Sequence, residues 1–173
     1  MASGRQQDKQ IYIGQSVPRL EDPPMVTGEA RYAADINFPG QIHMRMVRSQ
    51  HAHGEIVSID RAEALAMPGV VAVWTAGDIP EVPPVDFREG SIPALDAYRQ
   101  PVLADGRVRY VGEPVAAVFA EDAYLAEDAA EKVRVEVKEL PVTLSAEEPP
   151  GEFEAGRDTE AAVVKQGYGD IEA

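Results

Sequence analysis

Six short segments of the chain carry the alternating or β-branched apolar patterns that are typical of strands. In the first, the side chains of Ile42, Met44 and Met46 fall on one side of an extended backbone, and the polar residues between them fall on the other. That alternation predicts a half-buried strand. The six predicted strands cover residues 41–46, 55–59, 70–75, 107–111, 114–120 and 133–140.

Two short helices are predicted between these strands. Asp60 is followed three residues later by Glu63, which is the spacing of a capping box, and Pro68-Gly69 ends this first helix. Asp122 begins a second helix that runs to about Lys132. Each helix therefore stands between two strands, and each connects them.

The order of elements favours an α+β fold with a mixed β-sheet that carries the two short helices on one face. Residues 55–75 and 115–140 each read strand, helix, strand, and they look like weak internal copies. Strands 107–111 and 114–120 are expected to form a hairpin that is hinged at Gly112-Glu113.

The regions outside this body are expected to be less regular. Residues 1–10 are polar and are predicted to be a disordered lead, and residues 11–144 form the domain with an irregular N-terminal extension. Short extended pieces such as residues 30–36 are expected within that extension. Residues 77–100 form a long loop, and loops of this length often have a function or lie against another surface. Residues 145–173 mix acidic side chains with Pro and Gly, as in a solvated linker or docking tail.

The charge and the residue inventory exclude several classes of function. The 173 residues have a formal net charge of -14, which would repel a nucleic-acid backbone or an anionic membrane surface. The chain has no cysteine, which removes disulfides, Cys nucleophiles and thiolate-held iron–sulfur clusters. We expect a cytoplasmic location, because no segment shows the pattern of a secretory signal or approaches the roughly 20 apolar residues of a membrane span.

No motif in the sequence predicts a catalytic, cofactor-binding or metal-binding residue. His51 and His53 would lie on one side of a strand, but a closed metal site needs more ligands than the third histidine, His43, can complete. The pair is better interpreted as turn residues that hydrogen-bond the backbone. Residues 167–170 read GYGD and lack the glycine spacing of a dinucleotide fingerprint. The carboxylates near Asp122 are most simply the cap and the exposed face of a helix.

Four sequence blocks, in order, resemble one known family. Residues 14–22 read GQSVPRLED and residues 27–36 read TGEARYAADI, and a second block at 47–60 reads VRSQHAHGEIVSID. The third block, at 64–80, reads ALAMPGVVAVWTAGDIP. The fourth includes VRYVGEPVA at 108–116 and YLAEDAA at 124–130. Over about residues 13–144, the chain is similar to the N-terminal α/β-hammerhead domain of the large subunit of molybdenum hydroxylases, the xanthine dehydrogenase and aldehyde oxidase family. Gln50 departs from the proline that is common after the serine in that family.

The resemblance implies a part of an enzyme that hydroxylates an aldehyde or an N-heterocycle. Such complexes carry molybdopterin with molybdenum, [2Fe-2S] clusters and usually FAD. The implied partners are the molybdopterin-binding portion of the large subunit, an iron–sulfur subunit and a flavin subunit. The tail at 145–173 would lead toward the molybdopterin-binding portion. The family's catalytic residues lie beyond the hammerhead, so this chain alone is expected to be inactive and to serve assembly.

Five residues of the irregular N-terminal segment are candidates for a partner interface: Arg19, Asp22, Gly28, Tyr32 and Asp35. Ordinary turn formation or a local salt bridge explains them equally well. The alternative for the chain as a whole is a non-catalytic interaction module that retains the hammerhead fold for another partner.

Overall fold

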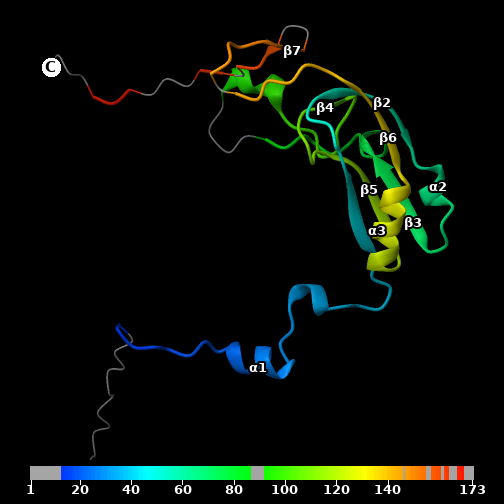
Figure 1. Cartoon of the computed structure of the whole chain (residues 1–173), viewed down its shortest axis with the longest axis vertical. Coiled ribbons are helices and arrows are strands. Elements are labelled where there is room, and N and C mark those ends of the chain that lie inside the picture. The colour runs from blue at the N-terminus through cyan, green and yellow to red at the C-terminus, as the bar shows by residue number, and fades with distance from the viewer. Residues whose placement is uncertain are drawn as a thin grey trace, which may run out of the picture. The chain divides into compact units, whose positions relative to one another are not determined.

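Six strands of the chain alternate, one by one, between two antiparallel sheets (Figure 1). A computed structural model describes residues 13–86, 92–145, 147–154, 157–160, 162–163 and 167–169. The first sheet has the order β1-β5-β3 and the second has the order β4-β2-β6. Their bounds are β1 His43–Arg48, β2 Gly54–Asp60, β3 Val70–Thr75, β4 Arg107–Val108, β5 Pro114–Ala120 and β6 Arg134–Glu139.

The helices α2 (Ala62–Leu65) and α3 (Ala123–Lys132) lie side by side against the first sheet (Figure 1). Asp122 caps α3, because its carboxylate accepts hydrogen bonds from the backbone N–H groups of Tyr124 and Leu125. The predicted second helix, its cap and its end at Lys132 are therefore confirmed. The helices cover a core cluster that contains residues of both helices and of β3 and β5.

Small side chains form the contact between α3 and the central strand β5. Ala129 of α3 and Ala116 of β5 are both fully buried, as is Ala64 of α2. Val118 completes this face of β5. Because alanine adds only a methyl group to the backbone, the packing depends on short distances between main chains rather than on large side chains. A larger side chain at any of these positions would therefore not fit unless the backbone moved.

A second, smaller core cluster joins the two sheets. Ala104, Val108 and Val115 are buried there, and Ile56 and Val137 of the second sheet pack against them. Gly54 at the start of β2 permits this close packing. A Cβ atom at Gly54 would lie 2.3 Å from Cγ1 of Val137 and 2.8 Å from the carbonyl oxygen of Lys138. The position therefore excludes any larger residue unless β6 moves.

The α+β class is confirmed, and one part of the predicted arrangement is corrected. In place of a single mixed sheet, the strands form two sheets in which every pair is antiparallel. The predicted hairpin of 107–111 with 114–120 is absent from these pairings, because β4 pairs with β2 whereas β5 pairs with β1 and β3. An alternating pattern shows which side chains share a face, but it does not identify the neighbouring strand.

The predicted capping box at the first helix is also corrected. Asp60 does accept a hydrogen bond from the backbone N–H of Ala62 at 3.0 Å. Glu63, however, turns to the other helix and forms ion pairs with Lys132 at 3.2 Å and Arg134 at 3.1 Å. The hydrogen bond from Lys132 is the main cause that lowers the pKa of Glu63, and Arg134 adds to it. The carboxylate thus links α2 to the end of α3 and the start of β6.

The N-terminal unit, residues 1–39, is separate from the unit that contains the sheets. It contains the six-residue helix α1 (Asp22–Thr27) and a 3-10 helix at Ala33–Asp35, and neither has a buried residue. The predicted extended piece at 30–36 is therefore wrong at its centre. Pro23 and Pro24 occupy the first helical turn, where their missing N–H groups cost nothing, and Gly28 ends α1 with a positive φ of 76°.

The long loop and the tail contain short elements that the sequence pattern did not predict. The loop has 3-10 helices at Ala76–Asp78 and Pro93–Tyr98, and the tail has the hairpin β7 (Glu152–Glu154) and β8 (Arg157–Asp158). The side chain of Arg157 donates to the carbonyl of Ala97, so the tail hairpin contacts the loop. The predicted disordered lead at 1–10 and loop residues 87–91 lie outside the described residues. Among the described residues, no helix has the length and apolar character that crossing a membrane requires.

Asp78 links the end of β3 to Arg61, the residue before α2. Its Oδ2 accepts hydrogen bonds from the backbone N–H of Thr75 at 2.8 Å and from Arg61 at 2.5 Å. The backbone bond from Thr75 is the largest cause that lowers the pKa of Asp78 to about 2, followed by the bonds from Arg61 and from the Thr75 hydroxyl. Arg61 also donates to the carbonyl of Val73 at 2.6 Å.

Replacing Ala129 by leucine should destabilise the fold by about 1–3 kcal/mol, because the larger side chain overpacks the contact of α3 with β5. The free energy of unfolding, measured with urea, would show the loss. Ala123→Leu places the same side chain at an exposed position of α3 and should change stability by less than about 0.5 kcal/mol. Equal stability of the two variants would contradict the packing described for Ala129.

The Asp78→Asn variant should lower stability at neutral pH, and its difference from wild type should shrink in acid. The pKa of Asp78 is lower in the folded chain, about 2, than its ordinary value of 3.8. The ionised form therefore stabilises the fold above about pH 4, and this contribution is lost as the pH falls to about 2. Urea unfolding between pH 2 and pH 7 measures it. Asp128→Asn, on the exposed side of α3, is the control, and a difference independent of pH would contradict the role given to Asp78.

Candidate functional site

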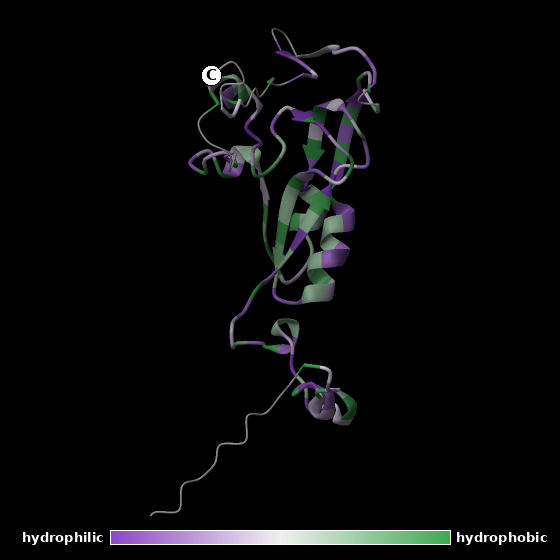
Figure 2. Ribbon diagram, turned by 90° about the vertical axis from the view of Figure 1, so that its left-hand side faces the viewer, coloured by the Kyte–Doolittle hydropathy of each residue, from purple (hydrophilic) through white to green (hydrophobic). Residues whose placement is uncertain are grey.

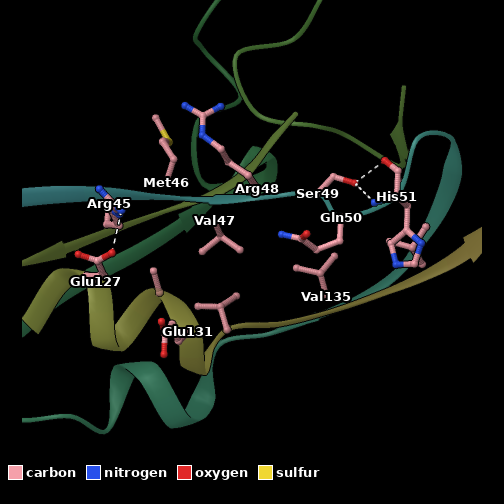
Figure 3. A pocket seen from close by; sticks show the side chains of 13 residues that line it. Arg45, Met46, Val47, Arg48, Ser49, Gln50, His51, Glu127, Glu131 and Val135 are labelled. Atoms are coloured by element: carbon pink, nitrogen blue, oxygen red, sulfur yellow. Dashed lines mark hydrogen bonds and ion pairs between the residues drawn. The ribbon is translucent and has the colours of Figure 1, made fainter. Parts of the chain in front are cut away.

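A groove of about 410 Å³ lies between the two sheets, lined by β1 from the first and by β6 from the second. Each is an edge strand of its own sheet, so part of its backbone hydrogen-bonding capacity faces away from its sheet partner. Val47 projects from β1 toward the same space as Val135 from β6 (Figure 3). The groove thus combines an apolar floor with open strand edges.

An exposed ion pair lies at one end of this groove and a histidine–carboxylate contact at the other. Arg45 contacts Glu127 of α3 at 2.8 Å, and Nδ1 of His51 lies 3.0 Å from Oε1 of Glu139. Both side chains of the first pair are about half exposed, at 55% and 51%. The lining of the groove combines apolar side chains of β1 and β6 with polar and charged ones, among them Glu127 and Glu131 of α3.

The two histidines join the turn after β1 to the end of β6. Nδ1 of His53 lies 2.7 Å from the carbonyl oxygen of Pro141, and because a carbonyl only accepts, Nδ1 carries the proton. The backbone N–H of Leu140 donates to the carbonyl of His53 at 3.0 Å. His53 therefore hydrogen-bonds the backbone, as its sequence context predicted. In the part of the chain that the structure describes, no group of three or more His, Cys, Asp or Glu side chains could hold a metal ion.

A buried carboxylate stabilises the turn between β4 and β5. Glu113 is fully buried, and it accepts a hydrogen bond from the backbone N–H of Arg109 at 2.5 Å and pairs with its guanidinium at 3.2 Å. A buried charge of this kind is tolerated only with such partners. The Glu113 carbonyl also accepts from the N–H of Ser49 at 2.9 Å. The pair therefore holds the turn against the end of β1, which makes its role structural.

Arg109 also lines a second cavity of about 320 Å³, together with His53, Pro141 and Thr159. The sequence analysis treated Gly112-Glu113 only as a hinge and missed the buried pair. The available signal was an arginine and a glutamate four residues apart within an apolar stretch. Gly151 and Thr159 of the tail line this cavity together with residues of the sheets, so the tail lies close to the sheets at this point.

The five predicted interface residues all form local structure in the N-terminal unit. Arg19 pairs with Asp22 at 3.2 Å, and the backbone N–H of Tyr32 donates to Asp35 at 2.9 Å. Gly28 supplies the left-handed conformation that ends α1. These contacts fit turn formation and a local salt bridge. An interface role for the five residues stays a prediction.

The sequence analysis did not identify which face of β1 is buried. Val47 reaches the core cluster beneath the helices, whereas Met46 and Arg48 project to the opposite side of the strand (Figure 3). Met44 is 54% exposed and Ile42 is 50% exposed. The apolar side of the alternation therefore faces away from the helices. The pattern contained the signal for a common face, but it could not show that this face lies outside the core.

The comparisons with known proteins agree over most of the chain. The chain is 46% identical over 172 residues to the 6-hydroxypseudooxynicotine dehydrogenase complex subunit gamma of Paenarthrobacter nicotinovorans, covering 95% of this chain and 22% of that relative. It is 44% identical over 132 residues to the nicotine 6-hydroxylase large subunit of the same organism, covering 76% of this chain and 16% of that relative. The chain thus spans less than a quarter of the length of either relative.

The fold also matches solved structures of this group. The Cu,Mo-CO dehydrogenase in its carbon monoxide reduced state superposes with a TM-score of 0.61 at 37% identity, covering 76% of this chain and 16% of that chain. The model of the aldehyde oxidase and xanthine dehydrogenase a/b hammerhead domain matches residues 27–141. These matches confirm the resemblance that the four sequence blocks indicated. The chain belongs to the aldehyde oxidase and xanthine dehydrogenase family of molybdenum hydroxylases, and it contains the hammerhead domain of that family.

Proposed function

We propose that this chain is the hammerhead portion of a molybdenum-dependent hydroxylase or dehydrogenase, and that it serves assembly and the shaping of the complex rather than catalysis. The observation that carries the proposal is the family match over residues 27–141, extended by 46% identity over 172 residues to a subunit of a dehydrogenase complex. The proposed substrate is an aldehyde or an N-heterocycle. The name of the nicotine 6-hydroxylase relative favours the N-heterocycle.

The side chains of this chain favour a role in assembly over a role in catalysis. Hydroxylation by such enzymes needs a metal and a base beside its bound oxygen. Among the described residues, no group of three or more His, Cys, Asp or Glu side chains could hold a metal ion. The carboxylates that line the groove, Glu127 and Glu131, are exposed. Glu113, which is buried in the turn between β4 and β5, is paired with Arg109.

The residues present do not fit the implied iron–sulfur clusters. An iron–sulfur cluster is held by thiolates, and the sequence has no cysteine. We therefore propose that molybdopterin, the [2Fe-2S] clusters and FAD are held by the larger part of the subunit and by iron–sulfur and flavin subunits. In this arrangement the hammerhead would contribute contact surface, including the N-terminal unit with Arg19, Asp22, Gly28, Tyr32 and Asp35. Those five residues would then form local turns and also contact a partner chain.

The isolated chain should contain no molybdenum and should not oxidise an aldehyde or an N-heterocycle. Its complex with the other parts of the enzyme should contain molybdenum and oxidise the substrate. The physical reason is that the chain has no cysteine to hold an iron–sulfur cluster, and that the described residues contain no cluster of metal-binding side chains. Elemental analysis and a dye-linked oxidation assay on both samples measure this outcome. The melting temperature of the chain should also rise in the complex, because a partner that binds only the folded form stabilises it.

Two results would contradict this proposal in different ways. Molybdenum and turnover in the isolated chain would assign catalysis to it. A complex that assembles and is fully active without the chain would instead favour the alternative, an interaction module that retains the fold for another partner. The control is the same assay on the complex reconstituted with wild-type chain.

A further inference from the structure

The strand register places six apolar side chains together on the face of the first sheet that is turned away from the helices. Met44 lies opposite Phe119, and Phe119 lies opposite Ala72. In the next row, Met46, Ala117 and Trp74 are aligned in the same way. Successive residues of a strand point to opposite faces, and Val73, Ala116 and Val118 point into the core beneath the helices. The six residues, which we term the outer face, are Met44, Met46, Ala72, Trp74, Ala117 and Phe119.

The outer face is apolar and partly open to solvent. Met44 is 54% exposed and Trp74 is 45% exposed, Met46, Ala72 and Phe119 are half-buried, and Ala117 is buried beneath its neighbours. The rings of Trp74 and Phe119 contact each other, with centroids 4.6 Å apart and an interplanar angle of 59°. Neither core cluster of the described residues includes any of the six. The strands of this sheet are largely green in Figure 2, whereas the long helix α3 carries polar turns.

Four of the six side chains of the outer face, two methionines and two aromatic residues, are of types that are common at protein interfaces. Aromatic residues, methionine and arginine are enriched at interface cores, and tryptophan often contributes much of the binding energy. Arg48 projects to the same side of β1 as Met46 and provides a charged rim (Figure 3). The rest of the chain is strongly acidic, with a formal net charge of -14. An apolar face is costly to expose on such a chain unless another surface covers it.

We propose that the outer face docks on an apolar surface of the larger part of the molybdenum-binding subunit, the part that lies outside the region this chain spans. The inference rests on the proposed function. The chain covers only 22% and 16% of two relatives, so about four-fifths of the polypeptide of such subunits lies beyond the region it matches. In those relatives the larger part is covalently continuous with this domain and is available to cover it.

A second copy of this chain is a poorer occupant. Two copies would bring together two net charges of -14, which opposes self-association. A stable interface between free chains also needs roughly 20–30 residues on each side, and the outer face supplies six. A surface of this size suits one contact within a larger assembly, where other contacts hold the parts together.

The test uses this chain co-expressed with the polypeptide that follows it in the subunit, produced as a separate chain. Met44→Glu should weaken their association by about tenfold or more, because a carboxylate would be buried without a partner. The matched control is Val57→Glu in β2, where an apolar side chain 58% exposed lies outside the outer face. It should change the dissociation constant by less than about twofold.

The outcomes separate this inference from the proposed function. If the wild-type chain does not associate at all, the proposed function fails. If it associates and Met44→Glu binds equally well, or if both variants lose affinity equally, the outer face is not the docking surface. A homodimer of the isolated chain that Met44→Glu dissociates would assign the face to a second copy and overturn the proposal.

A measurement on the wild-type protein avoids any effect of substitution on folding. Hydrogen peroxide oxidises exposed methionine side chains, and peptide mass spectrometry reports each site separately. Met44 should oxidise at least about fivefold more slowly in the complex than in the isolated chain, given its present exposure of 54%. An equal rate in both samples would overturn the proposal. So would protection of Met44 that is already complete in the isolated chain.

Discussion

The close contact of α3 with β5 is the constraint on which the rest of the structure depends. β5 is the central strand of the first sheet, and Ala116 and Ala129 bring it near the helix without large side chains between them. Because the core is built from alanine and valine, it gains little from any single residue and depends on the exact spacing of the backbones. The cap at Asp122 and the ion pairs of Glu63 hold α3 at that spacing from its two ends. β1 and β3 pair with β5 on its two sides, so the position of β5 determines theirs.

This arrangement leaves two surfaces of the first sheet uncovered by the helices. The helices cover one side of the first sheet, the outer face remains on the other, and a groove separates β1 from β6. The acidic and basic side chains near the groove are engaged with one another at the surface, where such pairs contribute little stability. This distribution supports the assembly role proposed above. The chain's membership in a family of large redox subunits is consistent with that use.

Local patterns allowed most elements to be predicted, whereas their pairing could not be. The run at Val70–Thr75 and the Asp122 cap depend on neighbouring residues, so β3 and α3 were predicted at their observed positions. α1 was missed because a six-residue helix that begins with two prolines has no apolar periodicity. The division into two sheets depends on contacts such as His43 with Ala120, which no local pattern encodes. For the same reason, Glu113 could be seen as a hinge residue but not as a buried partner of Arg109.

The alternation of strands between the sheets has a consequence for how the chain is made. β1, β3 and β5 belong to one sheet and β2, β4 and β6 to the other, so strands that are neighbours in the chain are never partners in either sheet. β1 and β3 find their partner only when β5 has been made, and β2 pairs first with β4 and completes its sheet only with β6. During translation, the first half of the domain would therefore emerge from the ribosome with unpaired strand edges and exposed methionine and tryptophan. Pairing between distant segments slows folding, because loop closure must precede the contacts, and unpaired edges remain open to aggregation until β6 has been made.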